Sequence, residues 1–228
     1  MKDLHFWGHA PIFTLICGVL YAQVPVKPAF SDIATRSAAT QLAIGSMVAQ
    51  GVMQGRSANQ FAPDAPLTRA EFAMSLQKMF SLPLPAQAAS FPDVPPTAPY
   101  YSAVEAVSPH LARSLLCFRC ALVKNFLPNE TVSRAEMTMI MAHVLVSRNK
   151  LKLPDQSETA AALAGVADGE KIPVPARPYF AAAIKNNVVD LKPGKTIALP
   201  MAVSRAETAE YMANVQKKFS MPVLRPVR

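Results

Sequence analysis

A tetrapeptide that occurs three times constrains this chain of 228 residues more than any other feature. It reads Thr-Arg-Ala-Glu at residues 68–71 and Ser-Arg-Ala-Glu at residues 133–136 and 204–207, so that successive copies begin 65 and 71 residues apart. A recurring period of this size is typical of chains built from small modules, none of which buries its own apolar face alone. The sequence therefore predicts three divergent copies of one module that pack around a shared core.

Two further marks recur ahead of the tetrapeptide. Seven residues before it, the first two copies carry Phe-x-Pro, at residues 61–63 and 126–128, and the third has Leu199-Pro200 slightly out of register. Each copy also opens on a large apolar residue followed two positions later by an aspartate. These aspartates are Asp32, Asp93 and Asp168. The marks divide the chain into a first repeat at residues 23–85, a second at 86–147, a linker at 148–165 and a third repeat at 166–221.

Each repeat is expected to contain two short helices joined by a turn. An Ala-apolar pair marks the start of the first helix, as at Ala43-Ile44, and Gly51 and Gly55 supply the positive φ of the turn that follows. After the tetrapeptide, apolar residues recur at helical spacing on one face. These residues are Phe72, Leu76, Met79 and Phe80, then Met137, Met141, Val144 and Leu145, and more loosely Thr208, Met212, Val215 and Phe219.

The fold class predicted is all-α. Besides the helical periodicity, the chain contains 21 prolines against 8 glycines, which favours short helices with stiff connections over long strands. The tetrapeptide itself has the pattern of a helix N-terminus. A Thr or Ser hydroxyl accepts from the backbone amide three residues on, and a Glu there returns a hydrogen bond to the cap, which together form a capping box. Each such cap stabilises its helix by about 1 kcal/mol.

Capping leaves the arginine of the tetrapeptide unexplained. Arg69, Arg134 and Arg205 occupy the first helical position, where the positive end of the helix dipole disfavours a cation. An arginine that recurs there three times implies an anion nearby. Two sources are open: the aspartate that opens each copy, in an intramolecular ion pair, or a carboxylate or phosphate of a polymer that binds at the helix N-terminus. A guanidinium fork suits either kind of anion.

The N-terminus indicates export. An apolar run from Ala10 to Ala22 has the length of a signal-peptide core and is shorter than the roughly 20 apolar residues of a membrane span. We interpret residues 1–22 as a signal peptide cleaved near Ala22, with an uncleaved anchor as the alternative. Cys17 follows Ile16 rather than a small residue, which argues against lipidation. The predicted location is the periplasm, the cell surface or another part of the envelope of a bacterium.

The chain offers little for catalysis. A Ser-x-x-Lys pattern at residues 75–78 lacks the companion motifs of the enzymes that use it. Cys117 and Cys120 lack the βαβ context of a redox pair, which leaves a local disulfide or two ordinary thiols. His110 and His143 lack the sequence spacing of metal ligands. We predict a protein that is not an enzyme and that has no cofactor and no metal.

The charge favours an anionic partner. The formal net charge is +8 at pH 7. For a basic protein in a cell envelope, the available polyanions are wall glycopolymers, peptidoglycan and lipid phosphates. The chain lacks the basic, aromatic-interleaved elements that usually recognise nucleic acid, so we expect no nucleic acid partner.

The marks of the first copy resemble the S-layer homology family, bacterial modules that attach exported proteins to the cell wall. The resemblance rests on Phe30-Ser31-Asp32-Ile33, Ala43-Ile44, Gly51-Val52, Gly55, Phe61-Ala62-Pro63 and Thr68-Arg69-Ala70-Glu71-Phe72, in order and spacing. The second and third copies keep fewer of these residues. The resemblance implies a pseudo-threefold assembly of helix-turn-helix repeats, with ligand grooves between adjacent repeats.

The resemblance also implies which residues bind. Positions that line the family's grooves correspond to the opening aspartates, the tetrapeptide arginines and an aromatic residue ahead of the first helix. The residues concerned are Asp32, Arg69, Asp93, Tyr100, Arg134, Asp168, Tyr179 and Arg205. The chain departs from the family in its aromatic positions, because its one tryptophan, Trp7, lies in the leader and the first copy has Ala38-Ala39 instead.

These arguments predict a non-catalytic cell-envelope module. Its expected partner is an anionic cell-wall polysaccharide, either a secondary wall polymer or a polymer linked to peptidoglycan. The alternative is a structural protein of the periplasm, or one that binds another envelope protein, in which the grooves have degenerated and the arginines only hold the copies together.

Overall fold

The computed structural model describes residues 30–87, 91–111 and 125–224, and over these ranges it is built from α-helices and short 3-10 turns without an extended strand. The all-α prediction is therefore confirmed. The helices are α1 (Ala38–Ala49), α2 (Arg69–Phe80), α3 (Tyr101–Val107), α4 (Arg134–Ser147), α5 (Gln156–Leu163), α6 (Arg177–Lys185) and α7 (Arg205–Lys218). In this part of the chain, every helix falls short of the length and apolar character that a bilayer crossing requires.

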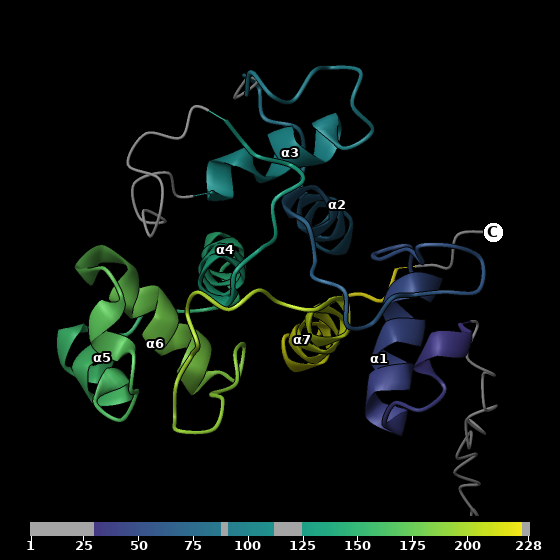
Figure 1. Cartoon of the computed structure of the whole chain (residues 1–228). Helices are drawn as coiled ribbons and strands as arrows, with labels where there is room; N and C mark the ends of the chain where they lie inside the picture. The colour runs from purple at the N-terminus through teal and green to yellow at the C-terminus, as the bar shows by residue number, and fades with distance from the viewer. Residues whose placement is uncertain (1–29, 88–90, 112–124, 225–228) are drawn as a thin grey trace, which may run out of the picture.

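Three helices form the centre of the molecule. Figure 1 views α2, α4 and α7 end-on, with α1, α3 and the α5–α6 pair outside them. Each outer helix packs on a central one: α3 on α2, α6 on α4, and α1 on α7. The last contact joins the beginning and the end of the described part of the chain, where α1 is the first helix and α7 the last. The chain thus closes on itself, and its core depends on residues from both ends.

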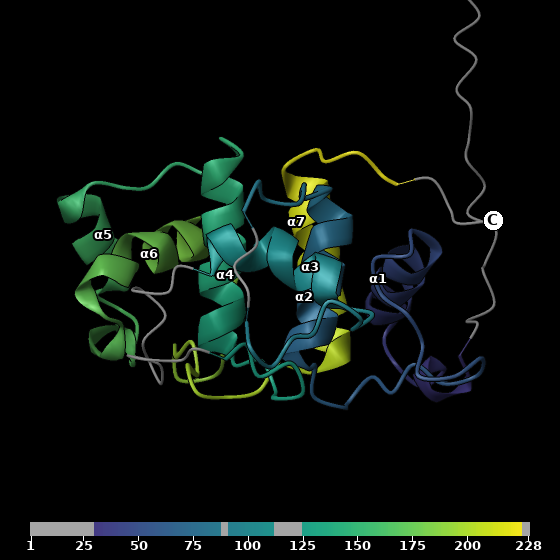
Figure 2. The same cartoon turned by 90° about the horizontal axis from the view of Figure 1, so that it is seen from above.

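A ring of backbone hydrogen bonds ties the central helices together just before they begin. Leu67 N donates to Val203 O at 3.0 Å, Val203 N donates to Val132 O at 3.0 Å, and Val132 N donates to Leu67 O at 2.9 Å. Each of these residues directly precedes a tetrapeptide, and each is buried. Because every member both donates and accepts, the three helix starts lie at one end of the molecule. Figure 2 shows the three helices side by side.

The helix caps follow the tetrapeptide, with one difference. At Thr68 and Ser133 both halves of the capping box form. At Ser204 the hydroxyl accepts from Glu207 N at 3.1 Å, but Glu207 turns its carboxylate to Arg134 and Lys192 rather than back to the cap. The third predicted capping box is therefore only half formed.

The apolar stripes predicted after each tetrapeptide face the core. The residues named in α2 and α4 are all buried, as are Thr208, Met212 and Val215 in α7, whereas Phe219 is half-buried. The stretch 148–165, expected to be a linker, contains α5. Sequence reasoning missed its signal, which is a capping box formed by Asp155 and Glu158.

The first segment shows two different uses of glycine after α1. Gly51 has φ 66°, in the left-handed region, as the predicted turn requires. Gly55 is needed for space instead: a Cβ there would lie 2.4 Å from the Phe30 ring and 2.7 Å from the Ser57 carbonyl. The Ala43-Ile44 pair, expected to start the first helix, lies in the middle of α1, because Ser37 caps that helix by accepting from Thr40 N at 3.1 Å.

Packing of α1 on the rest of the chain can be tested with two substitutions on that helix. Ile44 is fully buried and Leu42 is 64% exposed. We expect Ile44→Ala to lower the free energy of unfolding by about 2–5 kcal/mol, since it leaves a cavity. Leu42→Ala should change the same quantity by less than about 0.5 kcal/mol. Guanidinium denaturation of both variants provides the measurement, and equal losses would show that α1 is not packed as described.

Candidate functional site

Each tetrapeptide arginine is paired with the glutamate of another tetrapeptide. Arg69 pairs with Glu136 and Arg134 with Glu207. Arg205 closes the cycle by pairing with Glu71 at 2.8 Å, in the first tetrapeptide. We call each of these pairs an arginine junction and name it after its arginine.

The same guanidinium groups also bind backbone. Their Nε atoms donate to the carbonyl oxygens of Phe126, Ile197 and Phe61, at 2.7, 2.5 and 2.9 Å for Arg69, Arg134 and Arg205 respectively. Arg69 and Arg205 also lie over the rings of Phe126 and Phe61, at 5.3 and 4.6 Å from the ring centres. Such cation–π contacts add to the ion pairs. The Phe-x-Pro motif thus supplies the surface on which the arginine of another segment lies.

The three junctions differ in exposure. The side chain of Arg69 is 20% exposed, that of Arg134 is fully buried and that of Arg205 is 3% exposed. Burial lowers the pKa of Arg205, and the charge of Glu71 opposes that shift. Of the three guanidinium groups, that of Arg69 is therefore the most accessible to a ligand from solution.

Arg134 and Arg205 have further partners inside the protein. Arg134 donates to Tyr211 Oη at 2.9 Å and to Asp190 O at 2.6 Å, and Arg205 donates to Gln54 O. Burial raises the pKa of Tyr211, so its hydroxyl stays protonated beside the guanidinium. These contacts make both arginines part of the core.

A second cation reaches the glutamate at two junctions. Arg56 lies 3.2 Å from Glu71, and Lys192 lies 2.8 Å from Glu207. Arg56 and Lys192 each stand five residues before the residue whose carbonyl binds an arginine, whereas the corresponding position of the second segment is Ala121. Sequence reasoning missed these two cations, although their shared spacing was available as a signal.

The opening aspartates hold backbone rather than arginine. Asp32 accepts from Phe61 N and Ala62 N at 3.0 and 2.7 Å, and Asp93 accepts from Phe126 N and Leu127 N at 2.8 and 2.6 Å. Asp168 repeats the pattern with the amides of Ile197 and Leu199, at 2.8 and 3.2 Å. The sequence left open an intramolecular ion pair between each tetrapeptide arginine and an opening aspartate. That pairing is wrong, because each arginine pairs with a glutamate instead.

These aspartates stabilise a strained turn in each segment. Ala62, Leu127 and Ala198 have φ of 59°, 59° and 58°, values that residues other than glycine rarely adopt. Burial raises the pKa of Asp168, but hydrogen bonds from the amides of Ile197 and Leu199 and from Thr196 outweigh it and lower the pKa below its usual value. An ionised carboxylate at this position holds the turn that carries the arginine-binding carbonyl.

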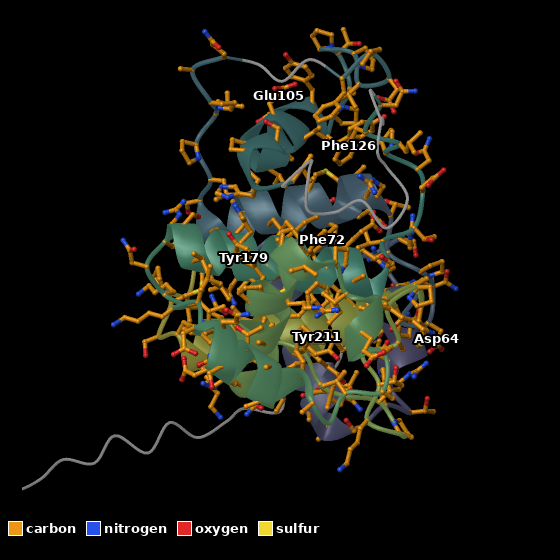
Figure 3. The ribbon with its side chains drawn as sticks, turned by 90° about the vertical axis from the view of Figure 1, so that its left-hand side faces the viewer. Asp64, Phe72, Glu105, Phe126, Tyr179 and Tyr211 are labelled. Carbon is orange, nitrogen blue, oxygen red and sulfur yellow. The ribbon has the colours of Figure 1, made fainter. Side chains whose placement is uncertain are left out.

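The two tyrosines predicted to bind the ligand belong to outer helices, one at the start of α3 and the other within α6. Tyr100 directly precedes α3 and packs, half-buried, against the core. Tyr179, labelled in Figure 3, lies on α6 and stacks on His143 at 5.6 Å between ring centres. The predicted signal peptide, Cys117 and Cys120 lie outside the described residues.

A hollow adjoins the first junction. Arg69 and Glu136 line it, and the other side chains that line it are apolar. Phe72 and Phe126, labelled in Figure 3, are two of these apolar side chains. Val107, Leu111, Val132 and Ile140 contribute the remaining large side chains. Because the apolar side chains that line the hollow are buried, the partly exposed guanidinium of Arg69 is the group that this junction offers to a ligand.

Comparison with known proteins gives the first segment a family likeness. Residues 29–73 match the S-layer homology domain. This range includes the Asp32 turn, the Phe61 carbonyl and the first tetrapeptide. S-layer homology domains are known for binding the cell wall, and they occur on cell-envelope and secreted proteins as non-catalytic anchoring domains.

A longer alignment links most of the chain to a much larger protein. It is 24% identical over 202 residues to an amylopullulanase of Thermoanaerobacterium thermosulfurigenes, and the alignment covers 87% of this chain but only 10% of that relative. The chain thus spans about a tenth of the length of the relative that it matches.

The difference between the junctions predicts different losses of stability. Arg134→Ala removes one partner of a buried ion pair and leaves the carbonyl oxygens of Ile197 and Asp190 without their donor, which costs about 3–5 kcal/mol. Arg69→Ala should lower the free energy of unfolding by less, since water reaches Glu136 once the arginine is gone. Urea denaturation of the two variants measures both losses, and an equal or larger loss for Arg69→Ala would contradict the assigned burial.

Proposed function

We propose that this chain is a non-catalytic cell-envelope module that binds an anionic cell-wall polysaccharide, and that the ligand binds at the Arg69 junction. The observation that carries the proposal is the exposure of Arg69, which exceeds that of the other two tetrapeptide arginines. The match of residues 29–73 to a domain known for binding the cell wall supports the same function.

The proposal includes three divergent repeats in a pseudo-threefold arrangement. Its support is the recurrence of three contacts at corresponding positions of each segment. In each, an aspartate holds a residue with positive φ, a carbonyl next to that turn accepts from an arginine, and a residue before the tetrapeptide joins the backbone ring. Divergent copies of one repeat account for all three recurrences, whereas unrelated segments have no reason to share them.

The three arginines divide into two roles under this proposal. Arg134 and Arg205 hold adjacent repeats together, because each is buried and donates to several acceptors inside the protein. Arg69 performs the same task with part of its guanidinium accessible to solvent. Of the family-derived candidates, Arg69 is the one that we assign to direct ligand contact.

The ligand chemistry follows from the guanidinium. A planar fork of N–H donors binds carboxylates and phosphates through paired hydrogen bonds. Polymers that carry acidic groups on sugars, such as pyruvylated wall polymers, present such anions.

The competing function has its own support. All three tetrapeptide arginines already have a glutamate partner, so that their charge is balanced inside the protein. A structural protein of the envelope, or a module that binds another envelope protein, needs no more than this. Binding to cell-wall material separates the two functions.

Sedimentation with purified cell-wall sacculi tests the proposal. We expect the wild-type protein to sediment with sacculi and Arg69→Ala to bind at least roughly tenfold more weakly, since it loses a charge-assisted contact worth about 1.5–3 kcal/mol. Arg36→Ala is the matched control, because Arg36 is a 34% exposed arginine paired with Asp64 on another part of the surface. Binding should also weaken as salt increases.

Two results would contradict the proposal in different ways. If the wild-type protein stays in the supernatant at low salt, the module does not bind the wall and the structural function is favoured. If Arg69→Ala folds, as judged by circular dichroism, and binds as well as Arg36→Ala, the ligand contacts another surface.

A further inference from the structure

The three central helices end in the same way. Just past each of them lies a residue other than glycine with positive φ. These residues are Ser81, Asn149 and Ser220, at 46°, 54° and 46°. In each case the amide of the next residue donates to the carbonyl five positions back, at 2.9 to 3.0 Å. This left-handed ending turns the chain out of the helix, so the segments that follow α2, α4 and α7 leave from equivalent positions.

These helix ends lie together at one end of the molecule. The helices are tied where they begin, by the backbone ring, and lie side by side (Figure 2). They contain 12, 14 and 14 residues, so each ends roughly 20 Å from the ring. Arg148 also joins two of the ends, because it follows α4 and donates to Phe80 O of α2 at 2.9 Å. We call the surface formed by residues 78–87, 148–154 and 217–224 the distal face.

The distal face carries cations without acidic residues. Its three segments contain five lysines and one arginine, and neither aspartate nor glutamate. All five lysines are exposed, and within the described part of the chain none of them forms an ion pair. These lysines are Lys78, Lys150, Lys152, Lys217 and Lys218. The face is therefore positively charged, whereas the tetrapeptide glutamates lie at the opposite end of the helices.

Helix capping explains only some of these lysines. The negative end of the helix dipole favours a cation in the last turn, where Lys78, Lys217 and Lys218 lie. Lys150 and Lys152 lie beyond the end of α4, outside the reach of that effect. The nearest acidic residue along the chain is Asp155, whose carboxylate caps α5 by accepting from Glu158 N at 2.8 Å. The charge of the distal face thus remains available to a partner.

Exposed apolar side chains lie among the lysines. Leu84 is 60% exposed, Leu153 is 40% exposed and Val223 is 71% exposed. Each lies three or four residues after the positive-φ residue of its segment and directly beside a proline, which stiffens the chain there. A single exposed leucine is ordinary on a protein surface. One such side chain at each of three adjacent helix ends, among unpaired lysines, indicates a surface that is apolar and basic together.

We propose that the distal face binds the surface of a lipid bilayer that contains anionic lipids. Lysines near such a bilayer are attracted by the negatively charged headgroups. Apolar side chains between them enter the boundary between headgroups and acyl chains. An anionic polymer in water accounts for the lysines, but it offers no apolar layer to the side chains of Leu84, Leu153 and Val223.

The proposed contact has a consequence for orientation. Arg69 opens α2, whereas the distal face lies where that helix ends. A module bound to a bilayer by its distal face therefore holds the Arg69 junction on the side away from the lipid. Membrane binding does not depend on the proposed wall-binding function, because the two surfaces share no residue.

Sedimentation of the full chain with lipid vesicles tests the proposal. We expect the protein to bind mixed vesicles of phosphatidylglycerol and phosphatidylcholine at least roughly tenfold more tightly than vesicles of phosphatidylcholine alone. Binding should weaken as salt increases. Arg69→Ala should bind the mixed vesicles as the wild type does, so that failure of wall binding and failure of membrane binding are separate results.

One pair of variants tests the charge. Lys150→Gln with Lys152→Gln should bind the mixed vesicles at least roughly tenfold more weakly, since two lysines near the headgroups are lost. Lys171→Gln with Lys195→Gln is the matched control, because it removes two exposed lysines close to the Asp168 turn, outside the distal face. The control should bind as the wild type does. Circular dichroism checks that both variants are folded.

A second pair of variants separates a membrane from a soluble polyanion. Leu84→Ser with Leu153→Ser keeps every charge and should weaken vesicle binding at least roughly threefold. Leu42→Ser with Val174→Ser removes two exposed apolar side chains elsewhere and should have no effect. The apolar run at residues 10–22 is present in every variant, so differences between variants report the distal face alone.

Four results would overturn the proposal. The wild type stays in the supernatant with mixed vesicles, or it binds phosphatidylcholine vesicles equally well. The variant at Lys150 and Lys152 binds as its control does. The variant at Leu84 and Leu153 binds as the wild type does, which would make the distal face a site for a soluble polyanion.

Discussion

The ion pair between one tetrapeptide arginine and the glutamate of another is the contact on which the rest of the structure depends. Arg134 lies in the interior with no exposed surface, so its charge requires compensation from Glu207 and from backbone carbonyls. The carbonyl that receives each guanidinium is next to a residue with positive φ, which an aspartate holds in place. Helix start, turn and neighbouring segment are thereby fixed together, and the closure of α1 on α7 follows.

The glutamates perform two tasks at once. Glu71 and Glu136 return hydrogen bonds to their own helix caps and also bind an arginine of another segment. Glu207 does not return a hydrogen bond to its own helix cap and pairs with Lys192 instead. Under the proposed function, the junctions of the buried Arg134 and Arg205 are structural, and the partly exposed Arg69 is the arginine available to a ligand.

Much of the fold was predictable because its signals are local. The helix caps and the apolar stripes each depend on residues that lie close together in the sequence, as does the order in which an aspartate precedes the tetrapeptide. These signals predicted the helices α2, α4 and α7. Partner choice was not predictable in this way. Both Asp93 and Glu136 follow Arg69 along the chain, and either could pair with it. Only the three-dimensional arrangement shows that the carboxylate of Asp93 already accepts hydrogen bonds from the amides of Phe126 and Leu127.

A double-mutant cycle between Arg205 and Glu71 tests the central claim most directly, because these residues are 134 positions apart in the sequence and meet only if the ring of junctions closes. The free energies of unfolding of Arg205→Ala, Glu71→Ala and the double variant isolate the coupling from the separate loss of the Thr68 cap. A coupling of at least about 1 kcal/mol is the result that the closed ring predicts. Additive losses, with a coupling below about 0.3 kcal/mol, would contradict it.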